Sequence, residues 1–220
     1  MPPPNGQPPH DARRWEVGVN DRSERRRFGF TLSPTFASFR LSLIGRRARP
    51  IRGGGVLGEF DVQLWRSLWL RAALSHTVHS LFDEFAVDED DEIVQTAARG
   101  KLQTTGGAIG LVYALDLGRV RPTIEAGVGG LLMQTPQAVQ DGQNGGACLD
   151  EGLCEVGLRC GSDNTCSAAP LGVLHGGTAI DVLLGHHWSA GAGLRYYAPT
   201  SAPGVFPVYL TVTARLGVRW

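Results

Sequence analysis

The chain of 220 residues is long enough for one domain with a tail. Its 21 Lys and Arg side chains balance 21 Asp and Glu side chains, and this zero net charge argues against a nucleic-acid partner, which needs a basic face. The 30 glycines argue against a helical bundle, because a glycine inside a helix costs about 1 kcal/mol. No run of about 18 apolar residues is present, so the sequence predicts no transmembrane helix.

Residues 1–27 are rich in proline and then in arginine and show no sustained hydrophobic period, which predicts a disordered N-terminal tail. We interpret its arginine cluster as a solvated segment rather than a phosphate-binding patch. The cluster consists of Arg22, Arg25, Arg26 and Arg27. The tail lacks the apolar stretch of about 7–15 residues that a secretory signal contains. An export signal is therefore not visible in this chain, and we expect a removed signal or a different start codon.

From Phe28 onward apolar residues recur at every second position, which is the period of a β-strand. The alternation is clearest in the last segment, 206–220. Weaker or shorter versions occupy seven other segments, namely 28–43, 56–64, 68–78, 109–117, 124–132, 172–184 and 188–198. The first of these loses its phase near Pro34, which predicts a β-bulge. The sequence thus predicts eight strands.

The connections between these strands alternate in length. Short turns are predicted at Arg66-Ser67, Gly118-Arg119 and Gly185–His187, and long links at 44–54, 84–102, 136–170 and 200–205. Short turns at one end and long loops at the other are typical of outer-membrane barrels. We therefore predict an all-β protein, an eight-stranded antiparallel up-and-down transmembrane β-barrel over 28–220, with a disulfide-rich loop insert at 136–170.

The second face of the strands carries five positive and five negative side chains, which we assign to a charge network in the barrel interior. They are Arg40, Glu59, Asp61, Arg71, Asp116, Arg121, Glu125, Asp181, Arg195 and Arg215. A packed interior needs equal numbers of positive and negative side chains, because unpaired buried charges are costly. The alternative is a soluble lipocalin-like ligand-binding barrel, with the apolar face inside and these charges in solvent.

Four of the five tryptophans lie near the predicted short turns, where an aromatic girdle would meet the membrane–water interface. They are Trp65, Trp69, Trp188 and Trp220. Strand parity leaves an inward orientation open for Trp65 and Trp69.

The last strand ends on an aromatic residue at the carboxyl terminus, with alternating apolar residues before it: Val212, Ala214, Leu216, Val218 and Trp220. In this respect the chain resembles the small OmpA-type and OmpX-type eight-stranded outer-membrane barrels of Gram-negative bacteria. The resemblance implies that these five residues are the signal read by the outer-membrane barrel assembly machinery. It also implies an outer-membrane location, with membrane lipids and lipopolysaccharide as surroundings.

The four cysteines, Cys148, Cys154, Cys160 and Cys166, are separated by five residues each. A zinc site of four cysteines usually needs closer pairs, so two disulfides that hold a loop without its own core are predicted. Three pairings are possible; we favour Cys148–Cys160 with Cys154–Cys166. Disulfides imply an oxidising compartment, and the stapled loop, 140–170, is a candidate for binding an external partner. Protease resistance without a partner is the alternative.

No catalytic, cofactor-binding or metal site is predicted. Lipid A-modifying barrels, the enzymatic alternative, pair a histidine with a serine near the outer rim, but His76 and His79 point to opposite faces of a strand, and His79 and Ser80 diverge. The acidic run 88–92 lacks the spacing of a calcium loop and is interpreted as solvated. The glycines at 53–55 and 129–130 are interpreted as barrel kinks or turns.

A pore is disfavoured, because side chains fill the interior of an eight-stranded barrel. The predicted function is therefore a non-enzymatic membrane anchor that displays its long loops or has a structural role.

Overall fold

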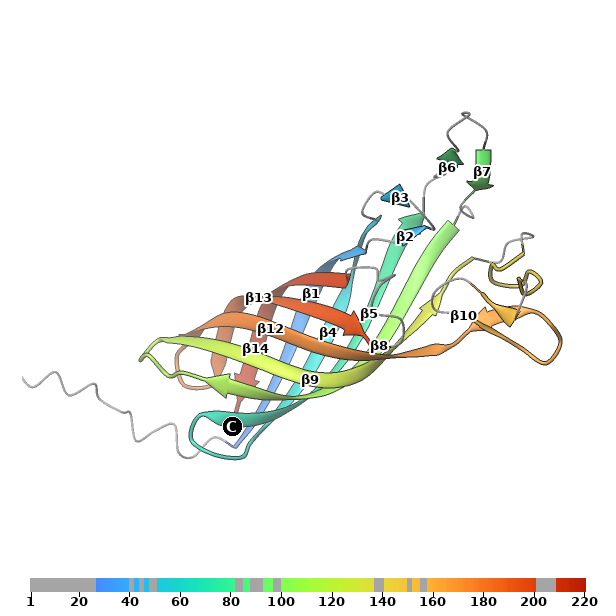
Figure 1. Ribbon diagram of the computed structural model, residues 1–220. Coiled ribbons are helices and arrows are strands. Elements are labelled where there is room, and N and C mark those ends of the chain that lie inside the picture. Colours follow the sequence, from blue (N-terminus) through green and yellow to red (C-terminus); the bar gives the residue numbers. More distant parts are fainter. Residues whose placement is uncertain are drawn as a thin grey trace, which may run out of the picture.

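The computed structural model describes residues 27–39, 42–43, 46–47, 51–81, 85–87, 93–96, 100–136, 141–149, 152–154, 158–200 and 209–220. Its eight long strands are β1 (Phe28–Phe39), β4 (Ile51–Gln63), β5 (Leu68–Leu81), β8 (Gly100–Ala114), β9 (Val120–Gln134), β12 (Pro170–Leu184), β13 (Trp188–Pro199) and β14 (Tyr209–Arg219). They form one closed antiparallel barrel in the order β1-β14-β13-β12-β9-β8-β5-β4 (Figure 1). Each strand pairs with its neighbours along the chain, and β14 closes against β1. The predicted eight-stranded antiparallel barrel is confirmed.

Three short hairpins lie in the long connections at one end of the barrel, opposite the short turns and the carboxyl terminus (Figure 1). They are β2 (Ser42–Leu43) with β3 (Arg46–Arg47), β6 (Phe85–Val87) with β7 (Ile93–Thr96), and β10 (Leu158–Cys160) with β11 (Cys166–Ala168). Gly118 and Gly185 occupy two of the short turns with φ angles of 70° and 78°, a region that favours glycine. Among the described residues, no helix is long and apolar enough to cross a membrane.

The first strand contains no bulge, so that prediction is wrong. β1 pairs with β4 in one unbroken register from Phe28↔Val62 to Phe39↔Ile51, and its register with β14 is also constant. Pro34 points outward within this strand. A proline lacks the N–H of one ladder hydrogen bond, but here it does not shift the strand.

Two strands begin five or more residues earlier than their hydrophobic pattern predicts: β4 at Ile51 and β8 at Gly100. In β8 the outward positions near the loop end carry Thr105, Gln103 and Lys101. Outward polar residues end the hydrophobic alternation although hydrogen bonding to the neighbouring strands continues. Periodicity therefore detects the apolar band of the barrel and misses the parts of the strands that extend beyond it.

The glycines at 53–55 and 129–130 lie inside β4 and β9, not in turns. At Gly53 the reason is a close approach, since a Cβ there would come within 2.5 Å of Nδ1 of His79. The missing side chain makes room for the imidazole ring inside the barrel.

The two faces of the barrel wall differ sharply in polarity. Outward positions carry exposed apolar side chains, such as Leu74 at 73% and Ile124 at 64% exposure. Inward positions carry buried polar and charged ones, such as Glu59 and Arg71. A soluble ligand-binding barrel has the opposite arrangement, so the soluble alternative does not describe this chain.

Candidate functional site

Glu59 on β4 lies at the centre of the buried charges inside the barrel. Its side chain is fully buried. Oε1 accepts a hydrogen bond from Nη2 of Arg195 at 2.5 Å, and Oε2 accepts one from Nη1 of Arg215 at 2.6 Å. Nη1 of Arg71 lies 3.2 Å from Oε1. Three guanidinium groups therefore compensate the cost of burying this carboxylate.

Arg71 on β5 connects Glu59 to two further carboxylates. Its Nε and Nη2 donate to both oxygens of Asp61 at 2.7 and 2.9 Å, and its Nη1 donates to Oε2 of Glu125 at 2.7 Å. Glu125 on β9 also accepts a hydrogen bond from Nε of Arg195. Glu59, Arg71, Glu125 and Arg195 thus form a closed ring of alternating charge across the barrel, and such charge-assisted bonds are about twice as strong as neutral ones.

A second group of charges lies nearer the short turns. Asp181 on β12 accepts hydrogen bonds from Nε of Arg215 at 3.1 Å and from Nη2 of Arg219 at 3.4 Å. Arg121 pairs with Asp116, with 3.3 Å between Nε and Oδ1. The side chain of Asp116 is 40% exposed, so this carboxylate lies at the rim of the barrel. The prediction that Asp116 belongs to the interior network is therefore wrong.

The interior differs from the predicted set in two other respects. Arg40 lies outside the described residues. Arg219, which is absent from the predicted set, points inward, with a side chain that is 12% exposed. It shares the polar face of the last strand with Arg215, and this shared parity is the signal that could have identified it.

Trp69 on β5 closes the short-turn end of the interior. It is 4% exposed and packs with Val112 and Ala114. The guanidinium carbon of Arg121 lies 4.5 Å from the centre of its ring, a cation–π geometry. The inward orientation that parity allows therefore applies to Trp69.

Aromatic and histidine side chains fill the interior between the charge ring and the loop end. The hydroxyl of Tyr209 lies 2.8 Å from Oγ1 of Thr77, which lies 3.1 Å from Nε2 of His79. The ring of Tyr197 lies 5.2 Å from that of Tyr209 and 5.9 Å from that of His175. Buried apolar residues complete this end: Ala37, Leu102, Leu131, Met133 and Val173.

Side chains leave little space inside. The cavity beside Arg71, Glu125, Arg195 and Arg215 has a volume of about 10 Å³, room for one water at most. At the level of these four residues, side chains therefore fill the interior.

The barrel wall separates His79 from Ser80, and His76, on the same face as Ser80, lies four residues away along β5, or about 13 Å. His79 is fully buried and points inward, whereas Ser80 and His76 point outward and are exposed. Nδ1 of His76 lies 3.0 Å from Oγ1 of Thr105 on the neighbouring strand. His175 points inward as well. Among the described residues these groups do not form a nucleophile–base pair.

The insert between β9 and β12 is held by two disulfides, Cys148–Cys160 and Cys154–Cys166, so the favoured pairing is confirmed. Sγ of Cys148 and Sγ of Cys154 are 3.9 Å apart, which places the two bridges side by side. All four sulfurs are bonded in disulfides, so none offers the thiolate that a metal ion would need.

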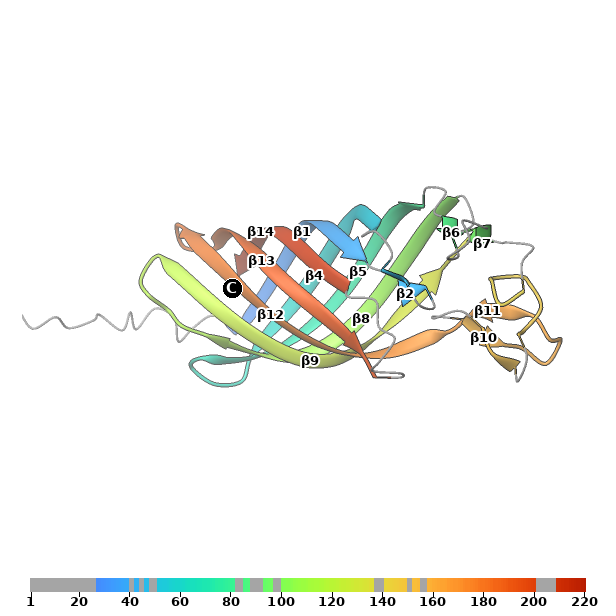
Figure 2. The ribbon, with the colours of Figure 1, turned by 45° about the horizontal axis from the view of Figure 1, so that its top comes forward.

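The insert is joined directly to the barrel wall (Figure 2). β11 leads into β12 after one residue, and Nδ2 of Asn144 donates to the carbonyl of Thr135 at the end of β9 at 2.7 Å. Within the insert, Cys166 N–H bonds Gly146 O at 2.9 Å. Covalent and backbone bonds thus replace the apolar core that this segment lacks.

The turn between β10 and β11 contains the acidic group Asp163. The hydroxyl of Thr165 donates to its Oδ2 at 2.8 Å, and the Thr165 N–H lies 3.3 Å from Oδ1. These bonds hold the pKa of the Asp163 carboxyl below its usual value. Asn164 between them has a φ of 58°, which asparagine tolerates.

The last strand places alternate side chains on the outer surface. Val212, Ala214, Leu216 and Val218 face outward on β14, and Trp220 follows it with 52% exposure. Trp65 and Trp188 are also exposed at this short-turn end. The predicted assembly signal is therefore a continuous outward-facing row.

No protein-family model matches the sequence, and no curated protein matches it significantly. Among solved structures, neisserial surface protein A aligns with a TM-score of 0.53 and 15% identity over 88% of this chain and 97% of that chain. The outer membrane protein OprG of Pseudomonas aeruginosa gives 0.50 and 11% over 89% and 97%. Ail of Yersinia pestis, in complex with the heparin analogue sucrose octasulfate, gives 0.48 and 12% over 88% and 99%. The first two show that this chain has the fold of small outer-membrane β-barrels.

Proposed function

We propose that this chain is an integral protein of the bacterial outer membrane that carries a stiff, disulfide-stapled loop at the cell surface for contact with an external partner. It acts as an anchor and display protein, without enzymatic activity, cofactor or pore. The observation that carries this proposal is the combination of a filled, charge-paired interior with a loop insert that is cross-linked and continuous with the barrel wall.

The polarity of the wall supports the membrane location. An apolar outer surface on a closed barrel needs a lipid environment, because exposed apolar patches larger than several hundred Å² are rare on soluble monomers. Closure of the barrel also satisfies the backbone hydrogen bonds that lipid cannot satisfy. The outward row from Val212 to Trp220 supports recognition by the barrel assembly machinery.

The construction of the insert supports a binding role. A loop that is ordered before it meets a partner loses less conformational entropy on binding. Leu149 and Leu153 pair across a bridge and are 43% and 58% exposed. An exposed apolar pair on a cross-linked loop is suited to contact a protein or glycan surface.

The topology can be tested with an epitope tag inserted at two places. One tag follows Gly152, which is exposed in the insert, and the matched tag replaces the turn at 185–187 at the other end of the barrel. We expect antibody to label intact cells only for the first tag and permeabilised cells for both. Labelling of the second tag alone on intact cells would invert the proposed orientation.

The display role can be tested by replacing 141–169 with a short turn. We expect displaying cells to lose adhesion to surfaces that the full-length protein binds, while the barrel still resists SDS until it is heated. Unchanged adhesion with an intact barrel would contradict the role of the insert.

A further inference from the structure

The outer surface of the barrel carries a charged pair that neither the ring inside nor the insert explains. Along the described outward positions of the eight strands, Arg52 on β4 and Lys101 on β8 are the charged residues. Both are exposed, and both lie near the loop end. The described outward positions of β4, β5 and β8 include no carboxylate.

The strand registers place these two cations close together. Gly53 pairs with His79, and Ser80 pairs with Lys101, so Arg52, Ser80 and Lys101 lie side by side in one row. Strands are spaced by about 4.8 Å, which puts the two Cα atoms about 10 Å apart. Two cations at this spacing can contact one doubly phosphorylated group.

Polar groups follow below the cations on two of these strands. His76 on β5 and Thr105 on β8 are joined by the 3.0 Å contact between Nδ1 and Oγ1. They lie four residues from Ser80 on β5 and from Lys101 on β8, toward the short-turn end of the barrel. This pair occupies the level between the charged row and the apolar band.

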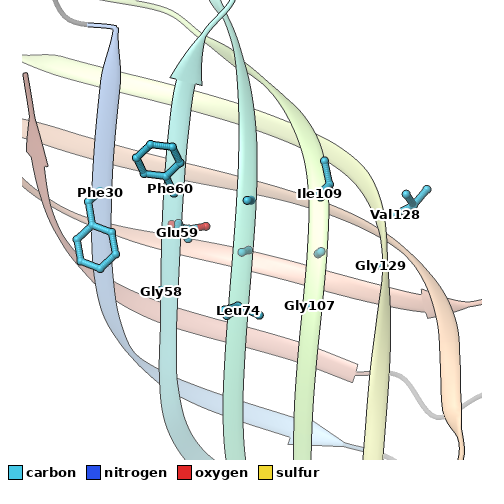
Figure 3. Close-up of a pocket in the computed structure, with 12 residues that line it drawn as sticks. Phe30, Gly58, Glu59, Phe60, Leu74, Gly107, Ile109, Val128 and Gly129 are labelled. Carbon is cyan, nitrogen blue, oxygen red and sulfur yellow. The ribbon is translucent and has the colours of Figure 1, made fainter.

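An apolar groove lies directly below this pair. It has a volume of about 680 Å³. Figure 3 shows Phe30 and Phe60 on one side of it and Ile109 and Val128 on the other. The groove exists because Ala72 is the small residue between Phe60 and Ile109, and because Gly58 and Gly107 leave space on both sides of Leu74.

The distance between the cations and the groove matches one leaflet. Lys101 and Gly107 are six residues apart on β8, or about 20 Å along the strand. At a tilt of about 40° this is about 15 Å along the membrane normal, which is half the thickness of a hydrocarbon core of about 30 Å. An acyl chain anchored by its headgroup at Arg52 and Lys101 would reach the groove.

We propose that the face formed by β4, β5 and β8 binds one phosphorylated, multiply acylated glycolipid of the outer leaflet. Arg52 and Lys101 contact its phosphates, His76 and Thr105 contact its polar linkages, and one acyl chain lies in the groove. The proposal rests on the membrane location inferred above. A second copy of the chain is the weaker occupant, because a two-fold axis along the membrane normal would bring cations against cations.

The test uses the full chain refolded in detergent and native mass spectrometry with bisphosphorylated hexa-acyl lipid A as the probe. We expect Arg52→Gln with Lys101→Gln to weaken binding about 30-fold, or about fivefold for each cation. Removing the phosphates from the probe should have a similar effect on the wild type. Phosphatidylethanolamine should bind weakly to both proteins.

The groove has its own matched variants. Gly58→Leu fills it without a clash, since a Cβ at this position meets no atom within 4 Å, and we expect about tenfold weaker binding from loss of about 50 Å² or more of apolar contact. Gly176→Leu on the outward face of β12 and Arg66→Gln in a short turn should leave binding unchanged.

Two outcomes would overturn the site. One is equal binding of lipid A to wild type and the double Gln variant, and the other is a protein dimer that Gly58→Leu abolishes. Heat modifiability on SDS gels is recorded for every variant. A wild type that folds as a soluble monomer in buffer without detergent would refute the membrane location itself, whereas a folded barrel that does not bind lipid A refutes only this site.

Discussion

The barrel interior and the insert achieve order by different means. In the interior, eight hydrogen-bonded strands fix the backbone, and the side chains that meet there can be charged because each finds partners. In the insert the strands are short, few side chains are buried, and two disulfides hold the chain. A continuous sheet can therefore support buried ion pairs, whereas this insert, which lacks such a sheet, is held by covalent cross-links.

Glu59→Gln should destabilise the barrel most, because it leaves three arginines around a neutral group. Removing one partner of a buried ion pair costs about 3–5 kcal/mol. We expect the free energy of unfolding to fall by this amount in urea titrations of the protein in micelles, followed by tryptophan fluorescence.

The matched variant is Asp116→Asn, at the partly exposed rim. It should change the free energy of unfolding by less than about 1 kcal/mol. If Glu59→Gln lowers the free energy of unfolding as little as Asp116→Asn does, the ring does not stabilise the barrel.

A smaller effect on the whole protein is expected when both disulfides are removed by changing the four cysteines to serine. Each bridge spans a sequence separation of 12 residues, and closing a loop of this size contributes about 3 kcal/mol. The loss should be confined to the insert. We expect trypsin to cleave at Arg159 much faster while the urea midpoint of the barrel stays unchanged; a lower midpoint would mean that the insert supports the barrel.

Arg219→Gln should destabilise the barrel by about 1 kcal/mol, since it removes one long hydrogen bond to Asp181 at the edge of the interior. Asp181 keeps its bond to Arg215 in this variant. Urea titration beside Glu59→Gln gives the comparison, and a loss as large as that of Glu59→Gln would place Arg219 within the central network.

The smallest effect concerns the pH response of the insert. Because the Thr165 hydroxyl and N–H lower the pKa of Asp163, the contribution of this turn is present above the ordinary pKa and is lost as pH falls through the lowered one. An NMR titration should place the Asp163 midpoint below that of an ordinary aspartate, because the Thr165 hydroxyl and N–H lower its pKa, and Thr165→Ala should raise it. A midpoint that Thr165→Ala leaves unchanged would exclude this cause.

Sequence reasoning recovers the barrel because alternation extends through each strand within the apolar band. It fails where outward residues turn polar, as in the first residues of β8, and where a proline mimics a change of phase, as at Pro34. For the interior, parity selects Glu59, Arg71 and Glu125 but cannot say which carboxylate each arginine meets. That choice depends on the stagger between strands far apart in sequence.

The disulfide pairing illustrates the same limit. Equal spacing leaves three disulfide pairings open, and only the folded insert distinguishes among them. In the fold, the backbone of Asn144 forms an isolated β-bridge with that of Cys166. The outward cations show the opposite case. Arg52 and Lys101 are visible in the sequence, but their proximity follows from the registers of β4, β5 and β8.

The direct passage from β11 into β12 also determines how the molecule bears mechanical load. A partner that pulls on the insert pulls β12 lengthwise, and the hydrogen bonds to β9 and β13 lie across that direction. The force is therefore shared by two whole ladders in shear, and they cannot be peeled apart one bond at a time. The barrel wall itself would therefore resist a force applied to a partner bound at the insert.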